Sequence, residues 1–257
     1  MRIIISPAKK MNVDLDSLNY HALPVFLKET GILMDYMKSL SYEESKKLWG
    51  CNEKLAAQNY ERFQHMDLTK RLTPAILSYE GIQYQYMAPA VFEEEMLSYV
   101  QEHLRILSGF YGVLKPMDGV TPYRLEMQAK TKAGDCSGLY EFWGGRLYEE
   151  VKDDSHVIIN LASKEYSKCI ETYLTPEDRY ITCVFGELSG EKVVQKGTYA
   201  KMARGEMVRF MAERNVEEPE EIREFQRLGY KYREELSNET EYVFVKKCQS
   251  ELIKKIY

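Results

Sequence analysis

The densest group of cations in the chain suits phosphate binding. Residues 192–214 hold six cations against two carboxylates, whereas the whole chain carries a net charge of −5. We expect a helix from Tyr199 whose apolar residues share one face. Lys201 and Arg209 then point away from that face and Arg204 lies at its edge. Such a helix presents its cations outward, as is required of a surface that contacts the phosphates of a nucleic-acid backbone. A solvated helix face is the alternative.

A tight turn between two expected helices also suits an anion. Gly50, Cys51 and Asn52 separate the helical patterns, and Lys54 follows. Glycine adopts a positive φ freely and asparagine tolerates one, so the turn aims unpaired N–H groups at a phosphate. The spacing resembles a helix-hairpin-helix element, although Asn52 replaces its second glycine. An ordinary helical hairpin packed on the core is the alternative.

Polar side chains follow two expected strands. Ser6 and Lys9 come after the first strand, and Asn160, Ser163 and Tyr166 follow a later one. Loops at the carboxyl ends of strands are favoured ligand positions in α/β proteins. The Ser-x-x-Lys spacing also occurs in penicillin-binding enzymes, but their Ser-Asp-Asn and Lys-Thr-Gly strings are missing here, so acyl-enzyme chemistry is not expected. Capping of the following helix is the alternative for the second group.

A fourth block, residues 105–127, combines three glycines, two prolines, aromatic residues and three cations. A loop of this composition brings guanidinium groups and ring faces together, which suits stacked bases and phosphates. An interior structural loop is the alternative. Arg105, Tyr123 and Arg124 are its candidate contact residues.

Metal and redox chemistry have little support in the sequence. The four histidines stand singly, and the five cysteines form no Cys-x-x-Cys pair, so a disulfide framework or zinc ribbon is not indicated. We expect no metal and no cofactor. With 44% hydrophobic and 29% charged residues the chain is globular. It has no apolar run long enough to span a membrane, so we expect a protein of the reducing cytoplasm.

Strand and helix patterns alternate irregularly, which predicts a mixed α/β (α+β) protein with a mixed sheet in one domain, residues 1–257. The expected strands are 2–6, 75–79, 156–161, a hairpin of 180–187 with 192–196, one near residue 230, and 242–246. The expected helices are 24–40, 41–49, 53–63, 93–107, 139–151, one from 164, 199–214, and one after Pro219.

Several blocks together resemble the YaaA family of bacterial peroxide-stress proteins. They match in order and spacing along nearly the whole chain: Ile5-Ser6-Pro7-Ala8-Lys9, residues 103–114, Pro122-Tyr123-Arg124-Leu125-Glu126-Met127, residues 139–144, residues 159–166 and residues 199–205.

The resemblance implies a cytoplasmic protein that is induced by hydrogen peroxide and lowers available intracellular iron. It also implies an unusual α/β fold whose helix-hairpin-helix element and basic cleft bind duplex or four-way-junction DNA. The hairpin maps to Gly50, Cys51, Asn52 and Lys54, with 109–112 as a second candidate. The cleft maps to these cations: Lys9, Arg105, Arg124, Lys201, Arg204 and Arg209.

The leading hypothesis is therefore a DNA-binding stress protein without chemistry of its own. The alternative is an enzyme that acts on a nucleoside or nucleic-acid base. Its candidate ligand pocket comprises Ser6, Lys9, Tyr123, Arg124, Asn160, Ser163 and Tyr166. Direct iron sequestration has the least support, because scattered His and Cys residues offer iron no site.

Overall fold

The computed structural model describes residues 1–190 and 192–246. In chain order the strands are β1 (Arg2–Ile5), β2 (Lys10–Met11), β3 (Thr73–Pro74), β4 (Tyr79–Glu80), β5 (Leu104–Ser108), β6 (Gly112–Leu114), β7 (Gly119–Val120), β8 (Val157–Leu161), β9 (Arg179–Ser189), β10 (Lys192–Val194), β11 (Tyr230–Tyr232) and β12 (Glu241–Lys246).

The helices are α1 (Leu27–Ser39), α2 (Tyr42–Trp49), α3 (Glu53–Gln64), α4 (Ala75–Ser78), α5 (Ile82–Met87), α6 (Glu94–His103), α7 (Leu139–Trp143), α8 (Arg146–Val151), α9 (Lys164–Glu171) and α10 (Gly197–Arg214). Three short 3₁₀ helices are η1 (Pro89–Val91), η2 (Pro219–Glu224) and η3 (Glu234–Leu236). Within the described part of the chain, no helix is both long enough and apolar enough to cross a membrane.

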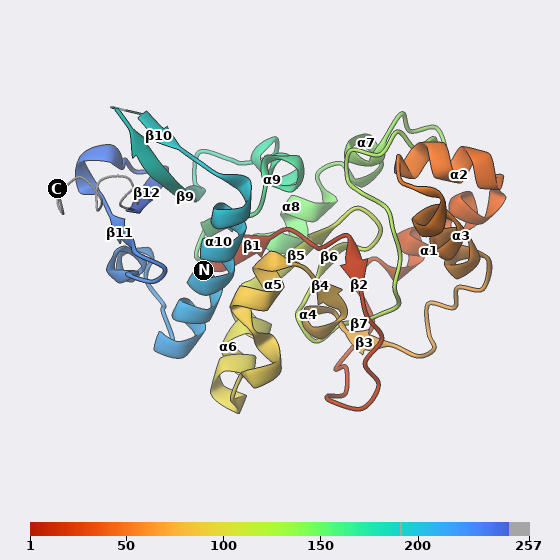
Figure 1. Cartoon of the computed structure of the whole chain (residues 1–257), viewed down its shortest axis with the longest axis horizontal. Coiled ribbons are helices and arrows are strands. Elements are labelled where there is room, and N and C mark those ends of the chain that lie inside the picture. Colours follow the sequence, from red (N-terminus) through yellow and green to blue (C-terminus); the bar gives the residue numbers. More distant parts are fainter. Residues whose placement is uncertain (191, 247–257) are drawn as a thin grey trace, which may run out of the picture.

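A mixed sheet of eight strands forms the centre of the molecule (Figure 1). Its order is β11-β12-β9-β8-β1-β5-β6, with β10 paired to β9. The five strands from β12 to β5 run parallel to one another, and β11, β6 and β10 are antiparallel to their neighbours. The chain is thus a mixed α/β protein with a mainly parallel sheet, which confirms the predicted fold class.

The central strand β1 explains where a ligand site forms. Ile3, Ile4 and Ile5 are fully buried, as expected for a parallel strand covered on both faces. After β1, the next strand of this sheet is β5, which lies on one side of the β1–β8 pair. After β8, the next strand is β9, which lies on the opposite side of that pair. Right-handed crossovers in opposite directions place their helices on opposite faces, and a crevice opens outside the carboxyl ends of the two strands.

Helix α10 packs against α5 more closely than most helix pairs allow. A Cβ atom on Gly205 would lie 2.1 Å from the carbonyl oxygen of Gln83 and 2.9 Å from the nitrogen of Met87. Only glycine permits this backbone contact. Gly205 therefore locks α10 onto α5, and Figure 1 shows the two helices together with α6 on one side of the sheet.

Residues 104–107 were wrongly predicted as the end of a helix. The helix α6 stops at His103, and Leu104 to Leu107 form most of strand β5, fully inside the protein. The apolar residues of this stretch satisfy both the helical and the strand period over such a short length. Pairing with β1, in which Ile3 faces Leu104, decides in favour of the strand.

Three further predictions need correction. Residues 75–78 form the short helix α4 rather than a strand, because a brief apolar run does not distinguish the two. The expected helix 139–151 is broken into α7 and α8 at Gly144, whose φ is +53°. The helix after Pro219 is a 3₁₀ helix, η2. The hairpin of β9 and β10 is confirmed, and Gly190 at its turn has a φ of +64°.

Candidate functional site

A cavity of about 390 Å³ lies in the crevice at the carboxyl ends of β1 and β8. Its walls come from the loop after β1, the start of α5, residues 123–126, the start of α9 and one face of α10. Six of the seven residues proposed for a ligand pocket line it: Ser6, Lys9, Tyr123, Arg124, Ser163 and Tyr166. The structure thus brings together residues that are far apart in the sequence.

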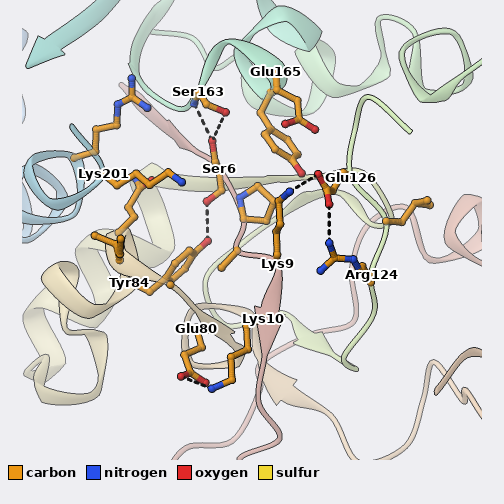
Figure 2. Close-up of a pocket in the computed structure, with 18 of the residues that line it drawn as sticks. Ser6, Lys9, Lys10, Glu80, Tyr84, Arg124, Glu126, Ser163, Glu165 and Lys201 are labelled. Atoms are coloured by element: carbon orange, nitrogen blue, oxygen red, sulfur yellow. Dashed lines mark hydrogen bonds and ion pairs between the residues drawn. The ribbon is translucent and has the colours of Figure 1, made fainter. Parts of the chain in front are cut away.

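Ser6 ties the two central strands together at the base of the cavity. Its hydroxyl accepts the backbone N–H of Ser163 at 2.8 Å and donates to the Ser163 hydroxyl at 3.2 Å. Its carbonyl accepts the phenol of Tyr84 at 3.0 Å (Figure 2). Ser163 begins α9 but makes no side-chain cap, so its hydroxyl belongs to the cavity.

Asn160 shapes the same corner without lining the cavity. The side-chain oxygen of this buried residue accepts the backbone N–H of Ala162 at 2.9 Å, and its amide nitrogen donates to Thr182 at 3.2 Å. Asn160 therefore fixes the turn from β8 into α9 and sets the position of Ser163. It is a positioning residue, not a wall of the pocket.

Buried tyrosines form the floor. The Tyr123 hydroxyl lies 2.6 Å from Ser108 Oγ and 2.8 Å from the Tyr79 hydroxyl. Burial raises the pKa of Tyr123 to about 12 and raises those of Tyr84 and Tyr166 as well. These phenols stay neutral at physiological pH, so the floor offers ring surface and neutral hydroxyl groups.

Ion pairs line the rim of the cavity. Lys9 Nζ lies 2.7 Å from Glu126 Oε2, and Arg124 contacts the other oxygen of the same carboxylate at 3.3 Å (Figure 2). Lys10 pairs with Glu80 at 2.6 Å. Lys9 and Lys10 are 65% and 70% exposed, so both remain accessible to a ligand.

A second carboxylate lies close to Glu126. Glu165, at the start of α9, accepts the backbone N–H of Gln128 at 3.3 Å. Burial raises the pKa of Glu165, and the negative charge of Glu126 adds to that effect. The cavity therefore contains two neighbouring carboxylates whose environments differ.

Two cations in the cavity have no ion-pair partner among the described residues. Lys201 reaches in from α10 (Figure 2), and Arg204 lines the wall one turn further along the helix. Within residues 1–190 and 192–246, neither side chain has a carboxylate within ion-pair distance. Arg204 Nε is buried without an acceptor, and burial lowers the pKa of this guanidinium. A buried cation without a partner is costly, so the site is suited to an anion.

The other cations predicted for the cleft lie elsewhere. Arg105 is 4% exposed on β5, and its guanidinium donates to the carbonyl oxygens of Gln101, Glu102 and Leu104. It caps the end of α6 at the amino end of the strand. Arg209 pairs with Glu213 one turn along α10 at 2.7 Å. Neither residue lines the cavity.

A tight turn joins α2 and α3, as the sequence predicted. Gly50 adopts a φ of +53°, as predicted. Asn52 does not need a positive φ; at −68° it instead caps α3 by accepting the N–H of Leu55. Glu53, the first residue of α3, contacts Lys46 and Tyr42, so a carboxylate lies beside the N–H groups that would meet a phosphate.

The second hairpin candidate, 109–112, is not a helical element. These residues form the turn between β5 and β6, and Phe110 and Tyr111 are fully buried. A Cβ atom on Gly109 would lie 2.6 Å from the carbonyl oxygen of Leu125. The glycine therefore allows residues 124–127 to pass directly over the turn.

The contributors to the cavity that were not foreseen from the sequence include Tyr84, Glu126 and Glu165. Glu126 and Glu165 lie in blocks already singled out for their neighbours, so their position beside Arg124 and Tyr166 was an available signal. Tyr84 lies on α5, which the sequence reading left unassigned. Of the cysteines, Cys51, Cys136, Cys169 and Cys183 are free thiols, and Cys248 lies outside the described residues.

The fold and the cavity define an α/β protein with an anion-compatible site at a switch point of its sheet. The family described as "Peroxide stress protein YaaA" matches residues 1–236. Similar proteins include a "UPF0246 protein" of Agathobacter rectalis, 62% identical over 96% of this chain and 99% of the relative. Another, from Lachnoclostridium phytofermentans, is 60% identical over 96% of each chain. The chain therefore belongs to the YaaA peroxide-stress family.

Proposed function

We propose that this protein acts in the response to peroxide stress by binding DNA through phosphate contacts at the carboxyl edge of the sheet. One observation carries the proposal. Lys201 and Arg204, without partners in the described residues, join Lys9, Lys10 and Arg124 around one opening, although the chain as a whole carries a charge of −5. A local basic site in an acidic protein is the expected footprint of a nucleic-acid ligand.

The turn between α2 and α3 is proposed as a second contact with the DNA backbone. Gly50 and Lys54 are exposed, as a helix-hairpin-helix contact requires. Glu53 opposes this role through its charge, although Lys46 partly neutralises it. Replacement of Lys54 by Gln is the direct test, and an unchanged salt dependence of binding would remove the hairpin from the interface.

The main test is fluorescence anisotropy of labelled duplex and four-way-junction DNA over a salt series. The variant K9Q/K10Q/K201Q removes three cations from the opening. We expect weaker binding and a slope of log K against log salt that is smaller by about 2 to 3. The matched control K28Q/K70Q/K152Q removes the same charge from lysines that do not line the cavity. Equal effects of the two triple variants would contradict the proposal.

A second candidate function is an enzyme that acts on a nucleoside or nucleic-acid base. The neighbouring carboxylates Glu126 and Glu165, beside Ser6 and Tyr166 in the cavity, favour it. Carboxylates in different environments suit general acid and base roles. We expect K9Q and Y166F to abolish turnover of a nucleoside substrate, which chromatography measures. Y166F should nearly keep DNA affinity, because it removes no charge from the opening. Turnover that survives both changes would contradict this function.

The effect on iron is proposed to be indirect, in a cytoplasmic protein. Among the described residues, no group of three or more His, Cys, Asp or Glu side chains is placed to hold a metal ion. Elemental analysis of the purified protein tests the proposal. Bound iron approaching one per chain would contradict an indirect effect and support direct sequestration.

A further inference from the structure

A groove lies next to the cavity, on the other side of one short segment. It has a volume of about 800 Å³ and runs between α1, α2 and residues 126–132. Glu126 lines both hollows, so residues 124–128 form the partition between them. The indole of Trp49 donates to the carbonyl oxygen of Arg124 at 2.6 Å, which fastens this partition to α2.

The free charges of the groove are positive. Lys47, Lys130 and Lys132 are exposed along its walls, and none of them has an ion-pair partner in the part of the chain that is described. Both carboxylates of the groove are already engaged, Glu44 by the Ser41 cap and Glu126 by Lys9 and Arg124. In the cavity, Lys201 and Arg204 likewise have no ion-pair partner among residues 1–190 and 192–246. An anionic chain that crosses the partition would meet unpaired cations on both sides.

The size and lining of the cavity limit what enters it. Pockets for single small molecules measure roughly 300–1,000 Å³, and this cavity of about 390 Å³ is at the small end. A stacked duplex does not fit, whereas one base and its sugar do. Tyr84 and Tyr166 provide ring surface, and hydroxyl groups of Ser6 and Ser163 provide polar contacts. The aromatic floor of the cavity suits the base of one nucleotide, and the cations at the rim suit its phosphate.

We propose that the cavity takes one nucleotide extruded from a DNA strand, while Lys47, Lys130 and Lys132 hold the backbone of the adjoining nucleotides in the groove. This inference rests on the proposed DNA binding and adds that one base leaves the stack. The cavity would recognise a nucleoside 5′-monophosphate. This group occurs both within a DNA strand and as a free nucleotide, so the test separates these two sources.

Extrusion makes affinity depend on how firmly the base is held in the duplex. Unpairing and unstacking oppose binding, and they oppose it least at a mismatch or an abasic site. We therefore expect a duplex with one central mismatch to bind about tenfold tighter than the matched duplex at the same salt concentration. This measurement uses the unmodified protein and needs no variant.

The direct probe is 2-aminopurine at the centre of a duplex, whose fluorescence rises when the base leaves the stack. The wild-type protein is expected to raise it. A8F places a ring in the cavity wall beside Lys9 and is expected to abolish the rise while low-salt duplex binding persists. K130Q/K132Q is expected to weaken binding of long single strands and to leave mononucleotide binding unchanged. K28Q/K152Q, outside both hollows, is the control.

The outcomes distinguish the inference from the proposed function. If no DNA binds at low salt, both fail. If duplex binds with a steep salt dependence, but fluorescence does not rise and mismatched duplex gains nothing, the extruded nucleotide is wrong and backbone binding stands. If a deoxynucleoside monophosphate occupies the cavity but 2-aminopurine fluorescence does not rise when the duplex binds, the cavity serves free nucleotides and the extrusion is overturned.

Discussion

Cations are paired differently at the amino edge of the central sheet, where its parallel strands begin, and at the carboxyl edge, where they end. At the amino edge, the N-terminal amine of Met1 lies 3.1 Å from Asp153, and Arg2 pairs with Asp153 at 3.2 Å and with Glu102 at 3.0 Å. Arg105 donates to three carbonyl oxygens at the same edge. At the carboxyl edge, Lys201 and Arg204 line the cavity and have no ion-pair partner among the described residues.

This difference separates cations that hold the fold from cations that are available to a ligand. A cation whose donors are used by the protein gains stability from the folded state. A partly buried cation without a partner, such as Arg204, costs stability until an anion arrives. The two kinds of arginine look alike in the sequence, but they should respond to substitution in opposite directions.

The largest loss of stability is expected at Arg105. R105A leaves the carbonyl oxygens of the last turn of α6 without their donor, so the free energy of unfolding should fall by about 3 kcal/mol. Urea denaturation measures it. R209A is the matched control, because that half-exposed pair with Glu213 contributes less than about 1 kcal/mol. A loss in R105A no greater than in R209A would contradict the assignment.

Asp118, near Arg105 at the amino edge, should give a pH dependence. Burial raises the pKa of this carboxyl from 3.8 to about 6. Between these values the folded protein binds more protons than the unfolded chain, so stability falls as pH rises from about 4 to 6. The expected fall is about 3 kcal/mol. Urea titrations at several pH values should show it in wild type and not in D118N; identical profiles would exclude the role of Asp118.

Arg204 should reverse the behaviour of Arg105. R204M removes a buried guanidinium whose Nε has no acceptor, so stability should be kept or should rise by up to about 1 kcal/mol. DNA affinity should fall about tenfold because a charged phosphate contact is lost. Denaturation and anisotropy on the same sample measure both. A clear loss of stability with unchanged affinity would place Arg204 among the structural cations.

The smallest effect concerns the hairpin. Gly50 has a φ of +53° with nothing within 4 Å of an added Cβ, so G50A should cost about 1 kcal/mol through backbone strain alone. G31A is the control, because Gly31 lies within α1 and is equally open; alanine there should stabilise by up to about 1 kcal/mol. Thermal denaturation compares the two. Equal shifts would exclude strain at Gly50.

The sequence predicted much of the site because its residues follow strands. Buried apolar runs such as Ile3–Ile5 identify strands, and the residues that follow them meet at the same edge of a parallel sheet. Ser6, Lys9, Ser163 and Tyr166 were recognised in this way. The blocks shared with the YaaA family also predicted the family membership that the comparison shows.

The remaining parts depended on contacts between distant segments. Residues 104–107 were predicted as helix because they fit a helix as well as a strand, and only pairing with β1 decides between them. That strand carries Arg105, which does not line the cavity. Tyr84 and α5 were missed because their position depends on the glycine contact with α10. The roles of Arg204 and Arg209 differ because Glu213 is within reach of one of them only.

Lysine labelling is a direct test of whether DNA binds at the carboxyl edge of the sheet. The protein is acylated briefly with and without saturating duplex DNA at low salt, and modification is quantified at each lysine by mass spectrometry. We predict that DNA protects Lys9, Lys10 and Lys201 at the carboxyl edge, while Lys70 and Lys152, outside the cavity and the groove, react equally in both samples. Protection of Lys70 and Lys152 with continued labelling of Lys9 and Lys201 would contradict it.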